Sequence, residues 1–271
     1  MALSILNNIP SLAAQNQLAI TSQGLQRTLF RLSSGSRINS GADDAAGLAI
    51  ADGLRANVTA LTQSARNAND GIGAMQVADG ALAQVTNLLN RAVTLATEAA
   101  TGSVSDDQRT ALNAEFTAIK DEIDRIGTNT TFNGTSVFSA STTSIFLSDA
   151  SSNSTIGVSV GVLSASGLSV SSDDLTDAAK ATTALGDINT AIATVASDRG
   201  TIGATINRLQ AAVNVMQNQV QNLSAAEDGI RSADIGQEVA NLAKYNILNQ
   251  TGIAALAQAN AAQQSVLTLL R

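Results

Sequence analysis

A long alternation of four- and three-residue apolar steps, from Ile188 to Leu223, constrains this chain more than any other feature. Ten of the eleven positions on this seam are apolar, and the exception is Arg199. Such spacing is the seam of a left-handed coiled coil. At 1.5 Å per residue the helix would be roughly 54 Å long. A helix of that length needs packing partners along it.

A second seam follows from Ile235 to Leu270, but four of its eleven positions are polar amides. A coiled coil uses a buried amide to fix register at a cost in stability. We therefore expect the C-terminal helix to be weakly folded alone and ordered in an assembly. The two seams are out of phase, which predicts a break near Asp228–Gly229.

The N-terminal half mirrors this pattern. A short seam in residues 5–12 resumes after a phase slip in 18–32, and a longer one covers 58–96 with polar Asp79 and Thr86 on its stripe. Ser105 to Gln108 reads as a capping box that opens a shorter helix. We expect Gly127 to end that helix.

The middle of the chain has a different composition. Residues 139–172 contain 13 Ser and 3 Thr in 34 positions. Short alternating runs at 144–147 and 156–160 predict small strands, and Asn133–Gly134 is a turn signal before them.

These elements predict a mainly α fold: a long antiparallel, coiled-coil-like helical rod with a small β-hairpin tip and paired N- and C-terminal helices. We expect an inner terminal-helix domain of residues 1–42 plus 230–271. The outer domain would be residues 43–229, with the β tip at about 131–172.

The composition argues against catalysis. The chain has no Cys, His or Trp and one Tyr, which removes thiolate and imidazole chemistry and the aromatic platforms of sugar sites. We expect no enzyme, cofactor or metal. A net charge of −7 disfavours nucleic acid, and no apolar run is long enough for a membrane span. The N-terminus does not resemble a signal peptide, which leaves a cytoplasmic protein or one exported without a cleaved signal.

Several polar pairs have two readings. Asp43–Asp44 could be a metal pair, but a helix start that complements the helix dipole is favoured, and the same holds for Asp173–Asp174. A Ser105–Lys120 dyad would arise only by accident of folding. Gly71 and Gly73 lie within a helical pattern, and we expect them to permit close helix packing rather than to hold a phosphate.

Residues 31–85 closely resemble the N-terminal region of bacterial flagellins, in the segments RLSSGSRINS, DDAAG and ARNANDGI. The C-terminal runs IRSAD, ILNQTG and LAQAN are similar to the same family. Flagellins usually have a Pro before their final leucines, and this chain has AAQQ there, so the helix should run straighter. The short middle resembles a minimal flagellin that lacks large outer domains.

The resemblance implies a structural subunit, exported through the flagellar type III apparatus, that polymerises outside the cell into the filament for swimming. A hook–filament junction protein, which shares the terminal motifs, is the alternative. Implied partners are further copies in a helical homopolymer, the flagellar cap, hook-associated proteins, and an export chaperone at the C-terminal helix.

Two sets of site residues follow from the seams and the resemblance. Arg91, Leu95 and Glu115 match an epitope of flagellins recognised by Toll-like receptor 5, although Arg91 and Glu115 could equally be a surface ion pair of little energetic weight. The expected polymerisation interface comprises Ile5, Leu12, Leu18, Leu25, Leu32, Ile235, Val239, Leu242, Ile253, Leu256, Leu267 and Leu270.

Overall fold

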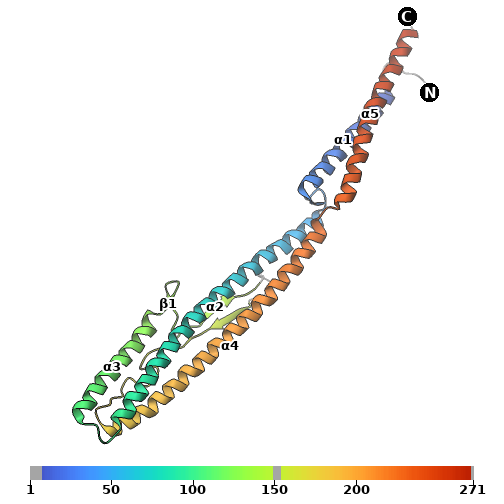
Figure 1. Cartoon of the computed structure of the whole chain (residues 1–271). Coiled ribbons are helices and arrows are strands. Elements are labelled where there is room, and N and C mark those ends of the chain that lie inside the picture. Colours follow the sequence, from blue (N-terminus) through green and yellow to red (C-terminus); the bar gives the residue numbers. More distant parts are fainter. Residues whose placement is uncertain (1–7, 149–153, 270–271) are drawn as a thin grey trace. The chain divides into compact units, whose positions relative to one another are not determined.

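The computed structural model describes residues 8–148 and 154–269, with side chains up to Ser265. Long helices dominate this part of the chain (Figure 1). The helices are α1 (Ile9–Ser34), α2 (Ala45–Ala99), α3 (Asp106–Asn129), α4 (Ala178–Arg231) and α5 (Ile235–Leu269). The expected mainly α fold is confirmed.

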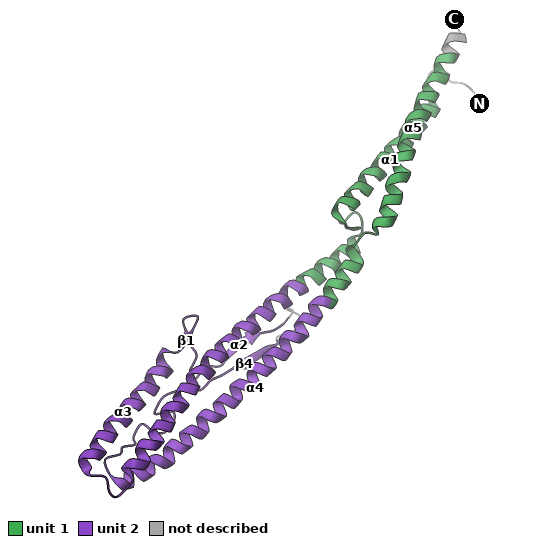
Figure 2. Cartoon of the chain, in the orientation of Figure 1, with its two compact units in different colours: residues 1–56, 222–271 green, residues 57–221 purple. Residues whose placement is uncertain are grey.

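The chain forms two compact units, one of residues 1–56 and 222–271 and the other of residues 57–221 (Figure 2). The first unit holds the α1–α5 pair, and the second holds α3, the strands and most of α2 and α4. The predicted pairing of the N- and C-terminal helices is thereby confirmed within the first unit.

The second unit has a conventional apolar core along α2 and α4. The α4 seam faces inward, because Ile188, Val195, Ile202 and Leu209 are each at most 2% exposed. The α2 residues Leu82, Val85 and Leu89 are equally buried. Burial of one apolar stripe per helix is what the 4-and-3 spacing predicts.

Two short antiparallel strand pairs complete the second unit. The pairs are β1 (Thr131–Phe132) with β2 (Thr135–Ser136), and β3 (Thr143–Phe146) with β4 (Thr155–Val158). Asn133 and Gly134 connect the first pair with φ of 50° and 76°, which are the positive values that a tight hairpin turn requires. The predicted small β element is confirmed.

Gly71 of α2 leaves room for the second strand pair to pack against the helix. A Cβ on Gly71 would lie 2.0 Å from Cδ1 of Ile145 in β3 and 3.5 Å from Leu209. The missing side chain therefore makes room mainly for a strand residue, where the sequence predicted close packing of helices.

Two helix ends differ from the sequence prediction. α4 continues through Asp228–Gly229 to Arg231, and the break falls at Ser232–Asp234. α3 runs two residues beyond Gly127, to Asn129. Gly127 is buried inside the helix, and a Cβ there would lie 1.9 Å from the carbonyl oxygen of Leu163. This glycine permits close packing of a loop and does not stop the helix.

The capping box at Ser105 is confirmed, with both reciprocal bonds to Gln108 present.

Candidate assembly surface

α1 and α5 pair antiparallel, and specific contacts fix their register along most of their length. Leu18 lies against Gly252, and the Tyr245 ring covers Gly24, where an added Cβ would be 2.6 Å from the ring. At the far end, the amide of Asn8 donates to the carbonyl of Ala259 at 3.2 Å. The two glycines let the helices approach closely at the points where a larger side chain meets them.

The side chains buried in this pair are polar. In α1 the buried residues are Ser11, Thr21 and Thr28, and in α5 Glu238 is buried. The Ser11 hydroxyl donates to the Asn260 side chain at 3.0 Å. No apolar side chain is fully buried in the described part of either helix. The pair therefore lacks the apolar core that stabilises the second unit.

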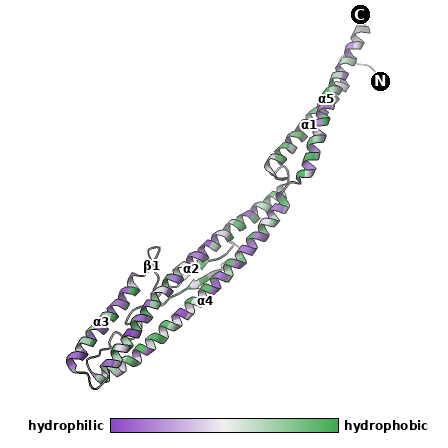
Figure 3. Ribbon diagram, in the orientation of Figure 1, coloured by the Kyte–Doolittle hydropathy of each residue, from purple (hydrophilic) through white to green (hydrophobic). Residues whose placement is uncertain are grey.

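The apolar side chains of these helices point outward instead. Ile20, Phe30 and Ile247 are 60% exposed or more, and apolar residues recur along both helices in Figure 3. Isolated exposed apolar residues are normal on a protein surface, but such a density of them marks an interaction surface. We call the following set the outward apolar face: Ile9, Leu12, Ile20, Leu29, Phe30, Ile235, Val239, Ile247, Leu248 and Ile253.

The structure divides the predicted interface residues into two groups. Leu12, Ile235, Val239 and Ile253 are exposed. Those that are half-buried are Leu18, Leu25, Leu32, Leu242 and Leu256. Ile5 and Leu270 lie outside the described residues, as does the side chain of Leu267.

The expected interface lacked six members of the outward apolar face: Ile9, Ile20, Leu29, Phe30, Ile247 and Leu248. Ile9 and Leu29 lie on the N-terminal seams, and the other four lie on no predicted seam. A helix that buries only one stripe carries polar residues on its other faces. Large apolar residues off the seam were therefore the sequence signal for a second apolar surface.

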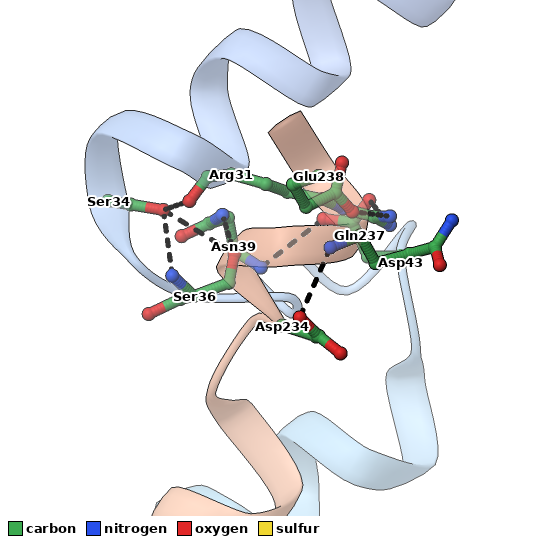
Figure 4. A network of polar contacts seen from close by, with 8 residues as sticks. All are labelled: Arg31, Ser34, Ser36, Asn39, Asp43, Asp234, Gln237 and Glu238. Atoms are coloured by element: carbon green, nitrogen blue, oxygen red, sulfur yellow. Dashed lines mark hydrogen bonds and ion pairs between the residues drawn. The ribbon is translucent and has the colours of Figure 1, made fainter. Parts of the chain in front are cut away.

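A charged cluster holds the end of α1, the following loop and the start of α5 together (Figure 4). Arg31 contacts the carboxylates of Glu238 at 3.4 Å and Asp43 at 3.5 Å. Burial alone would raise the pKa of Asp43, but N–H and hydroxyl donors from Asn39 and Ser40, together with Arg31, hold that pKa below 3.8. The carboxylate of Asp43 is therefore a fixed anion at neutral pH.

The backbone ties the same segments. Ser36 and Ser232 form an isolated antiparallel bridge. The Arg37 N–H donates to the carbonyl of Arg231 at 2.7 Å, and the Ala233 N–H donates to the carbonyl of Gly35 at 3.0 Å. These bonds continue the antiparallel register of α1 and α5 through both connecting loops.

The three expected receptor residues lie in the second unit. Arg91 and Glu115 form an exposed two-point ion pair, with distances of 2.7 and 3.0 Å. The hydrogen bonds and charge of Arg91 lower the pKa of Glu115. Leu95 has no exposed surface, because it faces the core from α2. Of the three expected receptor residues, Arg91 and Glu115 are therefore accessible to solvent and Leu95 is not.

The acidic pairs have structural roles. Asp44 begins α2 by accepting the N–H of Gly47 at 2.8 Å. Asp177, and not Asp173–Asp174, accepts N–H bonds at the start of α4. Lys120 bonds to backbone carbonyls while Ser105 caps α3, so the two do not form a dyad.

The described residues contain no cluster of acidic side chains suited to a metal ion. None of their helices is long and apolar enough to cross a membrane.

An α-helical chain with paired ends and an outward apolar face has the features of a structural subunit that assembles with copies of itself. Comparison with known families gives the same class. The model of the bacterial flagellin N-terminal helical region matches residues 5–143, and that of the C-terminal helical region matches residues 185–270. The chain belongs to the bacterial flagellin family.

Individual relatives match over nearly the full chain. A flagellin of Halalkalibacterium halodurans is 37% identical over 268 residues, covering 98% of both chains. The flagellar filament 33 kDa core protein of Treponema phagedenis is 34% identical, covering 98% of this chain and 99% of its own. The crystal structure of Bacillus cereus flagellin is similar with a TM-score of 0.50 and 32% identity, over 60% of this chain and 94% of that one.

Proposed function

We propose that this flagellin is the repeating subunit of a flagellar filament, and that neighbouring subunits cover the outward apolar face of α1 and α5. One observation carries the proposal: this helix pair buries hydroxyls and a carboxylate while it exposes isoleucine, leucine and phenylalanine. Burying such a side chain fully is worth about 1.5–3 kcal/mol. Several of them together supply the stabilisation that the pair lacks alone.

A helical filament suits this surface. The exposed residues lie on both helices, so the same unit offers different apolar positions to different neighbours. Heterologous contacts that do not close into a ring generate an open helix. The filament would propel swimming outside the cell after export through the flagellar type III apparatus.

The same exposure bears on the finer partners. Before assembly, the apolar residues of α5 need a cover, and a helix-binding groove on an export chaperone would provide one. The flagellar cap and the hook-associated proteins would meet the same helices at the two ends of the filament. Val239, Ile247 and Ile253 are the α5 residues that such partners would contact first.

Recognition by Toll-like receptor 5 remains a proposal for Arg91 and Glu115. Both side chains are about half exposed, and Arg is a frequent hot spot in interfaces. Leu95 would act indirectly, by holding α2 in the core.

A matched set of substitutions tests the assembly surface. Ile20→Ser, Phe30→Ser and Ile247→Ser in one chain remove apolar area without touching the second unit. The control replaces exposed polar residues of the same helices, Gln23→Ser, Gln26→Ser and Gln250→Ser. We expect the first variant to form no filaments in seeded polymerisation followed by electron microscopy, and the control to form them normally. Filaments of normal length from the first variant would contradict the proposal.

Amide hydrogen exchange provides a second test. We expect residues 1–40 and 232–271 to exchange rapidly in the monomer and to become protected in the filament, because their burial comes from neighbours. Equal protection in both states would remove the basis of the assignment.

A deletion of residues 265–271 should likewise prevent polymerisation while the second unit stays folded.

The hook–filament junction protein is the competing assignment. The relatives reported above bear flagellin or filament-core names, which favours the filament subunit. Immunogold labelling distinguishes the two: label along the whole filament supports the subunit, and a single short band at its base supports the junction protein.

A further inference from the structure

The outer side of α4 in the second unit has an exposed stripe without charge. Its inner side is the apolar seam, where Leu209, Val213 and Met216 are buried. On the opposite side of the same turns, exposed residues recur at steps of three and four, which places them on one face of the helix. We call this stripe the amide band: Ala211, Asn214, Val215, Asn218 and Gln221.

The net charge of the chain lies elsewhere. Residues 98–125 and 173–187 hold 11 of the 22 acidic residues but only 4 of the 15 basic ones, so they account for the whole net charge of −7. Net charge of one sign makes copies of a chain repel each other. Two copies therefore approach each other at the lowest electrostatic cost where their side chains are neutral.

Long neutral stretches occur in only three places among the described helices. The stretches of 18 residues or more without a charge are 9–26 in α1, 209–226 in α4 and 245–269 in α5. Two of the three lie in the helices that carry the outward apolar face. The centres of protein interfaces are depleted of charged residues. The amide band therefore has the composition of the surface already proposed for contact between copies.

Side-chain amides suit a contact between identical chains. Each amide has both an N–H donor and a carbonyl acceptor, so Asn and Gln on one copy pair with the same residue types on another, which carboxylates cannot do. Within the described residues the side chains of Asn214, Asn218 and Gln221 make no hydrogen bond. Val215, which is 56% exposed, adds an apolar side chain between them.

We propose that the amide band is a contact surface for another copy of this chain. The inference rests on the proposed function, because it adds a surface on the second unit to the apolar contacts of α1 and α5. The band covers 11 residues, which makes it about 16 Å long and roughly 10 Å wide. A stable interface buries about 800 Å² on each partner. The band is thus too small to hold a dimer in solution, and it acts where a polymer repeats the contact.

The first test places charge on the band. Asn214→Glu with Asn218→Glu introduces two carboxylates, while Asn214→Gln with Asn218→Gln introduces side chains of the same shape that keep both amides. We expect seeded polymerisation to give no filaments from the Glu pair and normal filaments from the Gln pair. Equal polymerisation of the two would overturn the proposal.

A second pair controls for position. Asn189→Glu with Ala193→Glu adds the same charges at the same spacing to an exposed part of α4 outside the band. This variant should polymerise like the wild type. If it formed no filaments, the effect of charge would not be specific to the band, and the proposal would be overturned.

A spin-label measurement adds no charge and decides the question if the Glu pair fails to fold by circular dichroism. The chain has no Cys, so Asn218→Cys provides a single site for a nitroxide label. We expect the electron spin resonance spectrum of this label to lose its mobile component on assembly, while a label at Asn189→Cys keeps it. A label at position 218 that stays mobile in filaments, or immobilisation at both positions, would overturn the inference.

A label at Ile247→Cys separates this inference from the proposed function. Immobilisation at position 247 but not at 218 would leave α5 covered and the amide band free, which contradicts only the present inference. Immobilisation at position 218 but not at 247 would support the band and contradict the proposed cover of α5.

Discussion

Asp79 of α2 and Arg199 of α4 form a two-point ion pair, with Nε to Oδ1 at 2.8 Å and Nη2 to Oδ2 at 3.3 Å. Each residue is a charged position on the mainly apolar stripe of its helix, and the two charged positions face each other. A helix pair shifted by one turn would separate them and leave both charges against apolar neighbours. The pair therefore favours one register of α2 and α4, as isolated polar residues do in coiled coils.

Asp79→Ala should destabilise the chain by about 0.5–1 kcal/mol at neutral pH, because both side chains are 40% exposed and solvent screens the pair. The hydrogen bond from Arg199 lowers the pKa of Asp79 below 3.8. Its contribution is therefore complete above pH 3.8 and is lost as pH falls through the folded pKa. Urea denaturation of variant and wild type at several pH values measures the difference.

The charge-reversed pair, Asp79→Arg with Arg199→Asp, should recover most of the lost stability at neutral pH. Arg125→Ala is the control, since its partner Glu122 lies three residues away on the same helix and the pair sets no register between helices. A double reversal no more stable than the single variants would argue against a direct pair.

Leu95→Ala should lower the stability by about 2–4 kcal/mol, since it removes a fully buried side chain from the core. Arg91→Ala should leave the denaturation midpoint nearly unchanged. Thermal unfolding followed by circular dichroism separates the two. If Leu95→Ala were as stable as the wild type, the side chain would not be in the core, and a direct role in receptor contact would be open again.

Gly127→Ala should destabilise by about 1–3 kcal/mol, because the new Cβ would lie 1.9 Å from the Leu163 carbonyl oxygen and a backbone atom moves only with its loop. Gly80→Ala is the matched control, with no atom within 4 Å of the added Cβ. It should be neutral or stabilise α2 by about 0.5–1 kcal/mol. Equal midpoints for both variants in urea denaturation would contradict the close packing at Gly127.

Arg31→Gln should weaken the α1–α5 pair by about 1–3 kcal/mol, because it leaves the buried Glu238 and the anionic Asp43 without their cation. In the filament, where these helices are expected to be protected, amide exchange in residues 235–245 should accelerate, while exchange in the second unit stays at its wild-type rate. Arg27→Gln is the control, at an exposed position one turn earlier in α1. Faster exchange throughout both units would show that Arg31 stabilises the whole chain and not the α1–α5 pair alone.

Much of the fold is visible in the sequence, because periodicity and capping are local properties. The seam from Ile188 to Leu223 predicted α4, and Ser105 predicted the start of α3. The exact helix ends were less predictable. Gly127 sits inside α3 since a loop distant in sequence packs on it, and no local pattern carries that information.

The candidate surface was only partly predictable for a related reason. A seam identifies residues on one face of a helix, but it does not say what covers that face. Leu18 and Leu12 were predicted together, yet Leu18 lies against Gly252 and Leu12 is exposed. The outward residues Ile20 and Phe30 belong to no seam, so only the folded helix pair places them in the set.

The first unit joins the first 56 residues to residues 222–271. α1 can meet α5 only when both segments are present, and closing a loop over this separation costs chain entropy before the contacts form. A chain that stops before residue 222 lacks one half of the pair and of its outward apolar face. If neighbouring subunits cover that face as proposed, the packing itself selects subunits that contain both segments, and a chain that lacks either one would not be incorporated.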